Sequence, residues 1–188
     1  MSIQITNVKV LSNPSKFTDP FKFLITFDCV APGIKGDLEW KLVYVGSADN
    51  EDKDQELDSV FVGPVHVGKS QFVFEAPAPD VTKIPQADLL DVTVILLTCS
   101  YNGQEFIRIG YYVNNEYNDS IEDSASTDKT KSIDVGKISR FILQDKPRVT
   151  RFVINWDQNK EPDQPTEKKC DKLIFFFFLR LQKGKRGQ

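Results

Sequence analysis

The segment that decides the fold is residues 92–113, which read VTVILLTCSYNGQEFIRIGYYV. Two runs rich in β-branched and aromatic residues flank the dipeptide Asn102-Gly103. An Asn-Gly dipeptide between such runs is the strongest short-range signal of a β-hairpin. We therefore expect two antiparallel strands, over Val92–Tyr101 and Gln104–Val113, joined by a tight turn.

The pairing register of this hairpin decides which side chains face the core. A two-residue loop would pair residue 101 with 104 and would place Arg108 on the more apolar face. A three-residue loop with a bulge at Gly103 would pair residue 97 with 107. It would also unite four apolar side chains on one core face: Ile95, Leu97, Ile107 and Ile109. Because a slip of one residue exchanges every side chain between the two faces, core burial favours the three-residue loop.

The opposite face of the hairpin then carries Val92, Val94 and Leu96 together with Arg108 and Tyr112. An outward apolar strip with an Arg and a Tyr is typical of a protein-binding surface. The pattern leaves two alternatives equally open. Either this face binds a partner, or a second sheet or loop of the same chain covers it.

Alternation with a period of two continues on both sides of the hairpin. Further strands are expected at residues 8–11, 21–29, 38–45, 60–62, 71–75 and 149–156. Turn residues such as Asn13-Pro14 and Pro32-Gly33 separate these segments. Short strands at this spacing predict an all-β fold, an antiparallel β-sandwich. Helix is sparse: a turn or two at Ile138–Leu143 and one turn around Pro85–Leu90.

The charges divide the chain into an acidic body and a basic tail. Residues 1–157 carry 16 basic and 23 acidic side chains, whereas residues 158–188 carry 8 basic and 4 acidic ones. A net-acidic body makes direct nucleic-acid binding unfavourable, because that mode needs clustered Lys and Arg against the phosphates. It suits a basic protein partner instead.

The body and the tail are also expected to differ in structure. We predict one domain over 1–157, with a long mobile loop at 118–137 that is rich in Ser, Thr, Asp and Lys. The tail, 158–188, is expected to be disordered. Its apolar run Leu173–Leu179 is far shorter than the ~20 residues that span a bilayer as a helix. Two readings remain for this run, a membrane-surface or partner contact and an aggregation-prone segment without a dedicated role. We favour the second and expect no membrane association.

The cysteines and the N-terminus point to an intracellular protein. The three cysteines, Cys29, Cys99 and Cys170, lie far apart and form no CxxC pair. This pattern is typical of a reduced compartment and favours neither a disulfide scaffold nor a zinc site. The first residues have no charged or apolar region of the kind found in a signal peptide.

Three features resemble catalytic or metal-binding motifs, and we reject each of them. Residues Gly63–Ser70 match the phosphate-loop pattern GxxxxGK[ST], but Pro64 removes a backbone donor and the residues after Ser70 alternate as in a strand. His66, the only histidine, lies in this segment without an argued catalytic partner. The six carboxylates of Asp49–Asp58 lack the central Gly of a calcium loop. We read them as a solvated loop or a docking site for a basic partner, and predict no enzyme, cofactor or metal.

Seven long strings of the chain resemble the anti-silencing-function histone chaperones of eukaryotes. The resemblance extends over nearly all of residues 1–156, and the strings that carry it are DLEWKLVYVGSA at 37–48, LDSV at 57–60, VGPV at 62–65, VTVILLTCSY at 92–101, GQEFIRIGYYVNNEY at 103–117, PRVTRF at 147–152 and INW at 154–156. The resemblance implies an elongated immunoglobulin-like sandwich that binds one histone H3–H4 dimer. It also implies a nuclear protein that is a monomer when free.

The resemblance assigns residues to two histone contacts. The C-terminal helix of H3 would lie on the concave sheet face. Binding there would block the surface on which two H3–H4 dimers pair. Its contacts match Val94, Val92, Leu96, Arg108, Tyr112, Asp54, Glu51 and Asp88. The C-terminal strand of H4 would add to a sheet edge. Its contacts match Leu143, Arg148 and Val149.

A separate groove would take short basic motifs of downstream chromatin-assembly factors. It matches Phe27, Asp37, Glu39, Asp58, Val60 and Val62. Gly36 stands where the family often has a carboxylate, so this groove is expected to bind more weakly here. Two rival readings are weighed against this one: a generic β-sandwich adaptor, and a nucleotide-binding protein acting through Gly63–Ser70, which the rejection of that motif disfavours.

Overall fold

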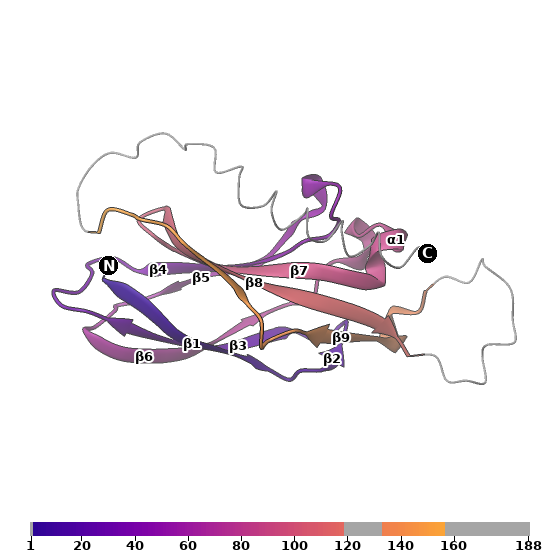
Figure 1. Ribbon diagram of the computed structural model, residues 1–188, viewed down its shortest axis with the longest axis horizontal. Helices are drawn as coiled ribbons and strands as arrows, with labels where there is room; N and C mark the ends of the chain where they lie inside the picture. The colour runs from indigo at the N-terminus through magenta and orange to yellow at the C-terminus, as the bar shows by residue number, and fades with distance from the viewer. Residues whose placement is uncertain (1, 119–132, 157–188) are drawn as a thin grey trace, which may run out of the picture.

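Two antiparallel sheets packed face to face make up the computed structural model, which describes residues 2–118 and 133–156 (Figure 1). The smaller sheet has three strands in the order β1 (Ile3–Leu11), β3 (Phe21–Cys29) and β6 (Gly68–Ala76). The larger sheet runs β2 (Ser15–Lys16), β9 (Ile138–Ile142), β8 (Gln104–Tyr117), β7 (Asp91–Tyr101), β4 (Leu38–Tyr44) and β5 (Gln55–Val62). The seventh strand, β10 (Arg148–Arg151), pairs with β8. The predicted all-β, elongated sandwich is confirmed.

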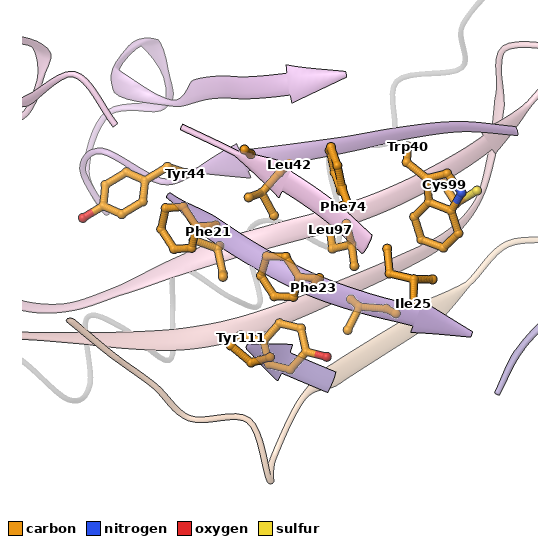
Figure 2. Close-up of a cluster of buried hydrophobic side chains, with 14 of the residues drawn as sticks. Phe21, Phe23, Ile25, Trp40, Leu42, Tyr44, Phe74, Leu97, Cys99 and Tyr111 are labelled. Carbon is orange, nitrogen blue, oxygen red and sulfur yellow. The ribbon is translucent and has the colours of Figure 1, made fainter. Parts of the chain in front are cut away.

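The core lies between the two sheets and is built from the alternating positions of the sequence. Figure 2 shows aromatic and aliphatic side chains of both sheets meeting there. Phe23 of β3 and Tyr111 of β8 stack across the layers with ring centroids 6.0 Å apart. Trp40 and Phe21 are fully enclosed as well, at 0% and 1% exposed. Each such side chain contributes on the order of 2 kcal/mol through burial, so the inward pattern of β3 and β4 fixes the sandwich.

The Asn102-Gly103 hairpin forms, but our register for it is wrong. Tyr101 pairs with Gln104 across a two-residue loop, and a bulge follows, so that Cys99 pairs with Ile107 and residue 97 with 109. Asn102 and Gly103 both have positive φ, 49° and 73°, as the tight hairpin turn requires. The bulge adds one residue to β8 and thereby restores the core face that we expected from a three-residue loop. Beyond the bulge, the predicted faces are therefore correct, although the predicted pairs are not.

The segment 138–143, where we expected a helical turn, is instead strand β9. Ile138, Arg140 and Ile142 are its inward residues, and all three are buried. An arginine at an inward position interrupts the apolar alternation, which is why the pattern did not indicate a strand. Figure 1 places β9 at one end of the molecule, beside β2.

The buried Arg140 connects β9 to the chain before β3. Its guanidinium donates hydrogen bonds to the carbonyl oxygens of Phe17 and Pro20 and to the hydroxyl of Ser15, at 3.0–3.2 Å. It also lies 3.7 Å from the centroid of the Phe21 ring. Burial lowers the pKa of Arg140 to about 10. A buried cation held by carbonyl oxygens and an aromatic face is costly to replace, since those acceptors would lose their partner.

The remaining short elements lie in the connections. They are the 3-10 turns η1 (Glu51–Lys53), η2 (Val81–Lys83) and η4 (Val135–Lys137), and the single helix turn α1 (Gln86–Leu89). The predicted turn around 85–90 is confirmed by α1. The acidic segment 49–58 is not a loop throughout, because it contains η1 and enters β5 at Gln55. Strand β5 is therefore longer than we expected, and β10 ends earlier, at Arg151.

The phosphate-loop-like segment Gly63–Ser70 connects the two sheets. It follows the end of β5 at Val62, and its last three residues are already in strand β6. The expectation of a strand at this place is confirmed, and the segment forms no helix N-terminus that could receive a phosphate. Most of the loop expected at 118–137 and the whole tail 158–188 lie outside the described residues. Among the residues that are described, no helix is long and apolar enough to cross a membrane.

Candidate protein-binding surfaces

Seven apolar side chains gather on the face of the large sheet that is turned away from the sandwich core. We call this group the apolar strip: Val43, Val45, Ala48, Val92, Val94, Leu96 and Tyr112. It forms a cluster of its own, separate from the main core. The smaller sheet packs on the other face, so the strip is not covered by a second sheet, and the expectation of a covering loop stays a prediction.

The centre of the apolar strip is less open than we expected. Val94 and Leu96 are 1% and 5% exposed, whereas Val92 and Tyr112 are half-buried. Val94 pairs with Tyr112 across β7 and β8, and Val45 donates a backbone hydrogen bond of 2.9 Å to the carbonyl of Val94. A partner would therefore meet Val92 and Tyr112 at the surface, and its deeper contacts would be to Val94 and Leu96.

Three members of the strip, Val43, Val45 and Ala48, were not among the predicted site residues. Val43 and Val45 are apolar residues at the positions of β4 and its extension where the alternation calls for polar ones. A strand with apolar residues on both faces is buried or contacted on both faces. That break in the alternation was the available signal.

Arg108 lies on the same face as the strip, opposite Thr98 and four residues before Tyr112. At about 3.4 Å per residue, the two side chains stand roughly 14 Å apart along β8. Arg108 forms an ion pair with Glu105, 2.8 Å from its Nε to Oε1 of the carboxylate. Its guanidinium also lies 5.7 Å from the centroid of the Phe152 ring. The structure thus holds Arg108 in place before any partner arrives.

An acidic rim, formed by Glu51, Asp54 and Asp88, lies around η1 and α1. Glu51 is exposed, and Asp54 and Asp88 are half-buried. The hydroxyl of Ser47 donates a 2.8 Å hydrogen bond to Asp88, which connects the chain after β4 to α1. The backbone of η1 packs directly on Gly46, where a Cβ would lie 2.1 Å from the carbonyl oxygen of Lys53. The rim therefore follows immediately on Val45 of the strip.

The residues predicted for an H4 contact lie along the other edge of β8. Strand β9 pairs with residues 113–117 of β8, and β10 pairs with residues 107–110. Between them, the backbone N–H of Leu143 donates to the carbonyl of Tyr112 at 2.9 Å. Leu143 and Val149 are 45% and 43% exposed. In the described part of the chain β10 pairs with β8 alone, so it is an edge strand of this sheet.

The residues predicted for a third groove fall into two groups. Asp58, Val60 and Val62 lie along β5 and pair with Leu42, Trp40 and Leu38 of β4. They therefore share the face of the large sheet that carries these core residues. Asp37 lies at the end of this row, since a Cβ on Gly63 would fall 1.7 Å from its carboxylate oxygen. These four residues are brought together at the edge of the large sheet.

Two members of that predicted set do not join the row. Phe27 is only 1% exposed and packs edge-on against Phe72 in the core, so it does not line a surface. Glu39 points to the opposite face of β4, where it forms a 3.1 Å ion pair with Lys41. The hydrogen bond to Glu39 is the first cause that raises the pKa of Lys41. Glu39 therefore shares a face with the apolar strip.

The described ranges 2–118 and 133–156 contain no cluster of three or more His, Cys, Asp or Glu side chains that could hold a metal ion. Cys29 and Cys99 are both buried, and burial raises the pKa of the Cys99 thiol well above its usual value. The surfaces built by these residues are suited to binding a protein.

Residues 1–157 match the family of ASF1-like histone chaperones. This chain belongs to that family. The ASF1-like chain is 56% identical over 155 residues to Histone chaperone asf1 of Drosophila melanogaster, which covers 82% of this chain and 69% of the fly protein. It is 52% identical over 168 residues to Histone chaperone ASF1 of Saccharomyces cerevisiae, and 51% identical over 162 residues to that of Candida albicans.

The ASF1-like chain spans only part of these relatives. The matched region covers 59% of the Saccharomyces protein and 64% of the Candida protein, against 87% and 86% of this chain. The family match over residues 1–157 confirms the resemblance that we expected from the strings of the sequence.

Proposed function

We propose that this ASF1-like chain binds one histone H3–H4 dimer through the apolar strip and carries no enzymatic activity. The observation that carries the proposal is the strip itself, an apolar cluster on the outer face of the large sheet in a chain of the histone chaperone family. Arg108 and the acidic rim lie at its two ends. A helix of H3 with one apolar face and basic flanks is complementary to such a surface.

Binding in this way would protect the dimer from wrong association. The strip would cover the H3 surface on which two H3–H4 dimers pair, and release would hand the dimer to the next factor during nucleosome assembly or disassembly. The apolar side chains would supply most of the affinity, because desolvated central contacts dominate interfaces. The carboxylates of Glu51, Asp54 and Asp88 would steer the basic histones and make the encounter rate depend on salt.

The C-terminal strand of H4 would add to the edge of the large sheet at β10. The edge position of β10 and the exposure of Leu143 and Val149 support this contact. An added strand forms main-chain hydrogen bonds, and alternate side chains give specificity. Arg148 lies at the beginning of the same strand, opposite Gly110.

Short basic motifs of chromatin-assembly factors would bind along β5. Asp37 and Asp58 supply carboxylates there, and Val60 and Val62 supply half-buried apolar surface between them. This row and the apolar strip lie on opposite faces of the large sheet. The chain would therefore hold a histone dimer and an assembly factor at the same time. We place this chaperone in the nucleus, as a monomer when free, with 1–157 as the folded domain and 158–188 as a tail.

A titration of the full chain tests the proposal. H3–H4 dimer should bind saturably with a stoichiometry of one. Its Kd should be about tenfold or more below that for the dimer of the other two core histones, measured at the same ionic strength. That second dimer is the matched control, since it is similarly basic. Equal affinity for the two dimers would mean that charge alone is recognised, and would overturn the role of the strip.

A further inference from the structure

We propose that Glu105 is a positioning residue, which holds Arg108 in the orientation that the histone partner requires and cancels its charge. This inference rests on the proposed function, because it concerns the end of the same binding face. It adds a residue that contacts the partner only through Arg108.

The contact between the two side chains is bidentate. Nε of Arg108 donates to Oε1 of Glu105 at 2.8 Å, and Nη2 donates to Oε2 at 3.1 Å. Two parallel bonds fix the plane of the guanidinium as well as its position. They leave Nη1 and the second hydrogen of Nη2 for another acceptor. The two side chains are 16% and 21% exposed, so the pair lies at the surface without being fully solvated.

The bulge in β8 makes this contact possible. In a regular strand, residues three positions apart point to opposite faces of the sheet. The extra residue at Phe106 changes that relationship, because Ser100 pairs with Glu105 while Cys99 pairs with Ile107. Bulges commonly redirect a side chain in this way. Glu105 and Arg108 therefore share the face of the apolar strip.

Phe152 supports the guanidinium from a third segment. Its ring centroid lies 5.7 Å from Cζ of Arg108, within the range of a cation–π contact. The backbone N–H of Phe152 donates to the carbonyl of Phe106 at 2.9 Å, so the bulge residue also holds the chain that carries the ring. Glu105 and Phe152 thus contact the same guanidinium, and the bulge at Phe106 helps to position both of them.

This arrangement suits a basic partner. A free arginine beside the strip would repel histones, whereas the paired group presents N–H donors without a net charge. A fixed arginine also loses less freedom when the partner binds, and preorganisation of this kind raises affinity. Glu105 would therefore affect histone binding through the charge and the orientation of Arg108.

A double-mutant cycle on the full chain tests the inference, with H3–H4 dimer as the ligand. We expect Glu105→Gln to raise the Kd about tenfold and Arg108→Ala to raise it by a similar factor. In the Arg108→Ala background, Glu105→Gln should change the Kd by less than about twofold. Glu75→Gln is the control, since it also removes a glutamate charge from an ion pair, the 3.2 Å contact with Lys22 on the smaller sheet. It should leave the Kd unchanged.

Each outcome separates the inference from the proposed function. Additive losses in the double variant would show that Glu105 acts on the partner or the fold directly, and would overturn the inference. Full affinity of Glu105→Gln would overturn it as well. A thermal unfolding curve for each variant shows whether Glu105→Gln destabilises the fold in general. A general destabilisation would be seen both with Arg108 present and in the Arg108→Ala background. Failure of the unsubstituted chain to bind the dimer would instead overturn the proposed function.

Discussion

The phenolic oxygen of Tyr44 accepts a 3.1 Å hydrogen bond from the side-chain amide of Asn115, and both residues are buried. This bond joins β4 to β8 on the core side of the large sheet, across the intervening strand β7. Burial raises the pKa of Tyr44 to about 12, with the hydrogen bond from Asn115 acting in the opposite direction. The neutral phenol is therefore the form that the folded protein favours.

The first prediction concerns alkaline pH. Because the folded pKa of Tyr44 lies above the ordinary value near 10, its contribution to stability is complete below pH 10 and is lost as the pH rises toward 12. The loss should reach about 3 kcal/mol. Tyr44→Phe should flatten this decline, at a cost of about 1 kcal/mol at neutral pH for the lost hydrogen bond. Urea unfolding at a series of pH values measures both effects, and an unchanged alkaline slope in the variant would contradict the assignment.

The second prediction concerns the centre of the apolar strip. Val94→Arg should abolish binding of H3–H4 dimer, because it places a charge among the deepest contacts. The domain should stay folded, with about 1–3 kcal/mol lost, since the long side chain can extend over the strip toward solvent. Val73→Arg is the control, at a position 51% exposed on β6. Co-elution of folded Val94→Arg protein with histones would contradict the role of the strip.

The third prediction separates the two binding faces. Asp37→Arg should weaken binding of a basic assembly-factor peptide by about tenfold or more, since a repulsive charge replaces an attractive one. It should leave binding of H3–H4 dimer unchanged. Fluorescence anisotropy with the peptide and a titration with the dimer measure the two affinities. Glu75→Arg, at an exposed acidic position on β6 of the smaller sheet, is the control for net charge. Equal losses for both ligands would mean that the faces are not independent.

The fourth prediction concerns the support of the acidic rim. Gly46→Ala would bring a methyl group to 2.1 Å from the carbonyl oxygen of Lys53, so η1 must move. We expect a loss of about 1–3 kcal/mol in stability and weaker histone binding, because the rim is displaced. Gly36→Ala is the control. Its methyl group would meet the side chains of Tyr101 and Asn102 at 3.3 Å, which small shifts can relieve. Urea unfolding and the dimer titration measure both variants, and equal effects of the two substitutions would contradict the close packing of η1 on Gly46.

The hairpin shows how far the sequence could predict this structure. Period-two alternation identified both strands, and the requirement for an apolar core placed Ile95, Leu97, Ile107 and Ile109 on the core face. Phe106, which we had expected on the outward face, is instead buried. The predicted pairs were wrong because two arrangements give the same faces for the residues beyond the turn. One is a three-residue turn, and the other is a two-residue turn followed by a bulge inside the strand. Choosing between them depends on where Phe106 packs, and it packs against Trp156, far away in the chain.

The other departures also arise from long-range contacts. Strand β9 was missed because Arg140 occupies a core position, and only its partners at residues 15–21 make that burial possible. The row along β5 was largely identified through the family strings. Its exceptions, Phe27 and Glu39, depend on which way each strand faces, and a resemblance in sequence does not convey that.

The bulge in β8 also determines which changes in length this surface tolerates. Without Phe106, Ile107 would follow Glu105 directly, and the pairing from Tyr101 with Gln104 to Val92 with Asn114 would run without interruption. Loss of this residue costs a buried aromatic ring but leaves Arg108 and Tyr112 facing outward. Loss of Gly110 would instead put part of β8 out of phase with β7, and polar side chains would turn into the core on one side of the gap. Insertions and deletions in this strand should therefore be accepted at the bulge before they are accepted at any other position.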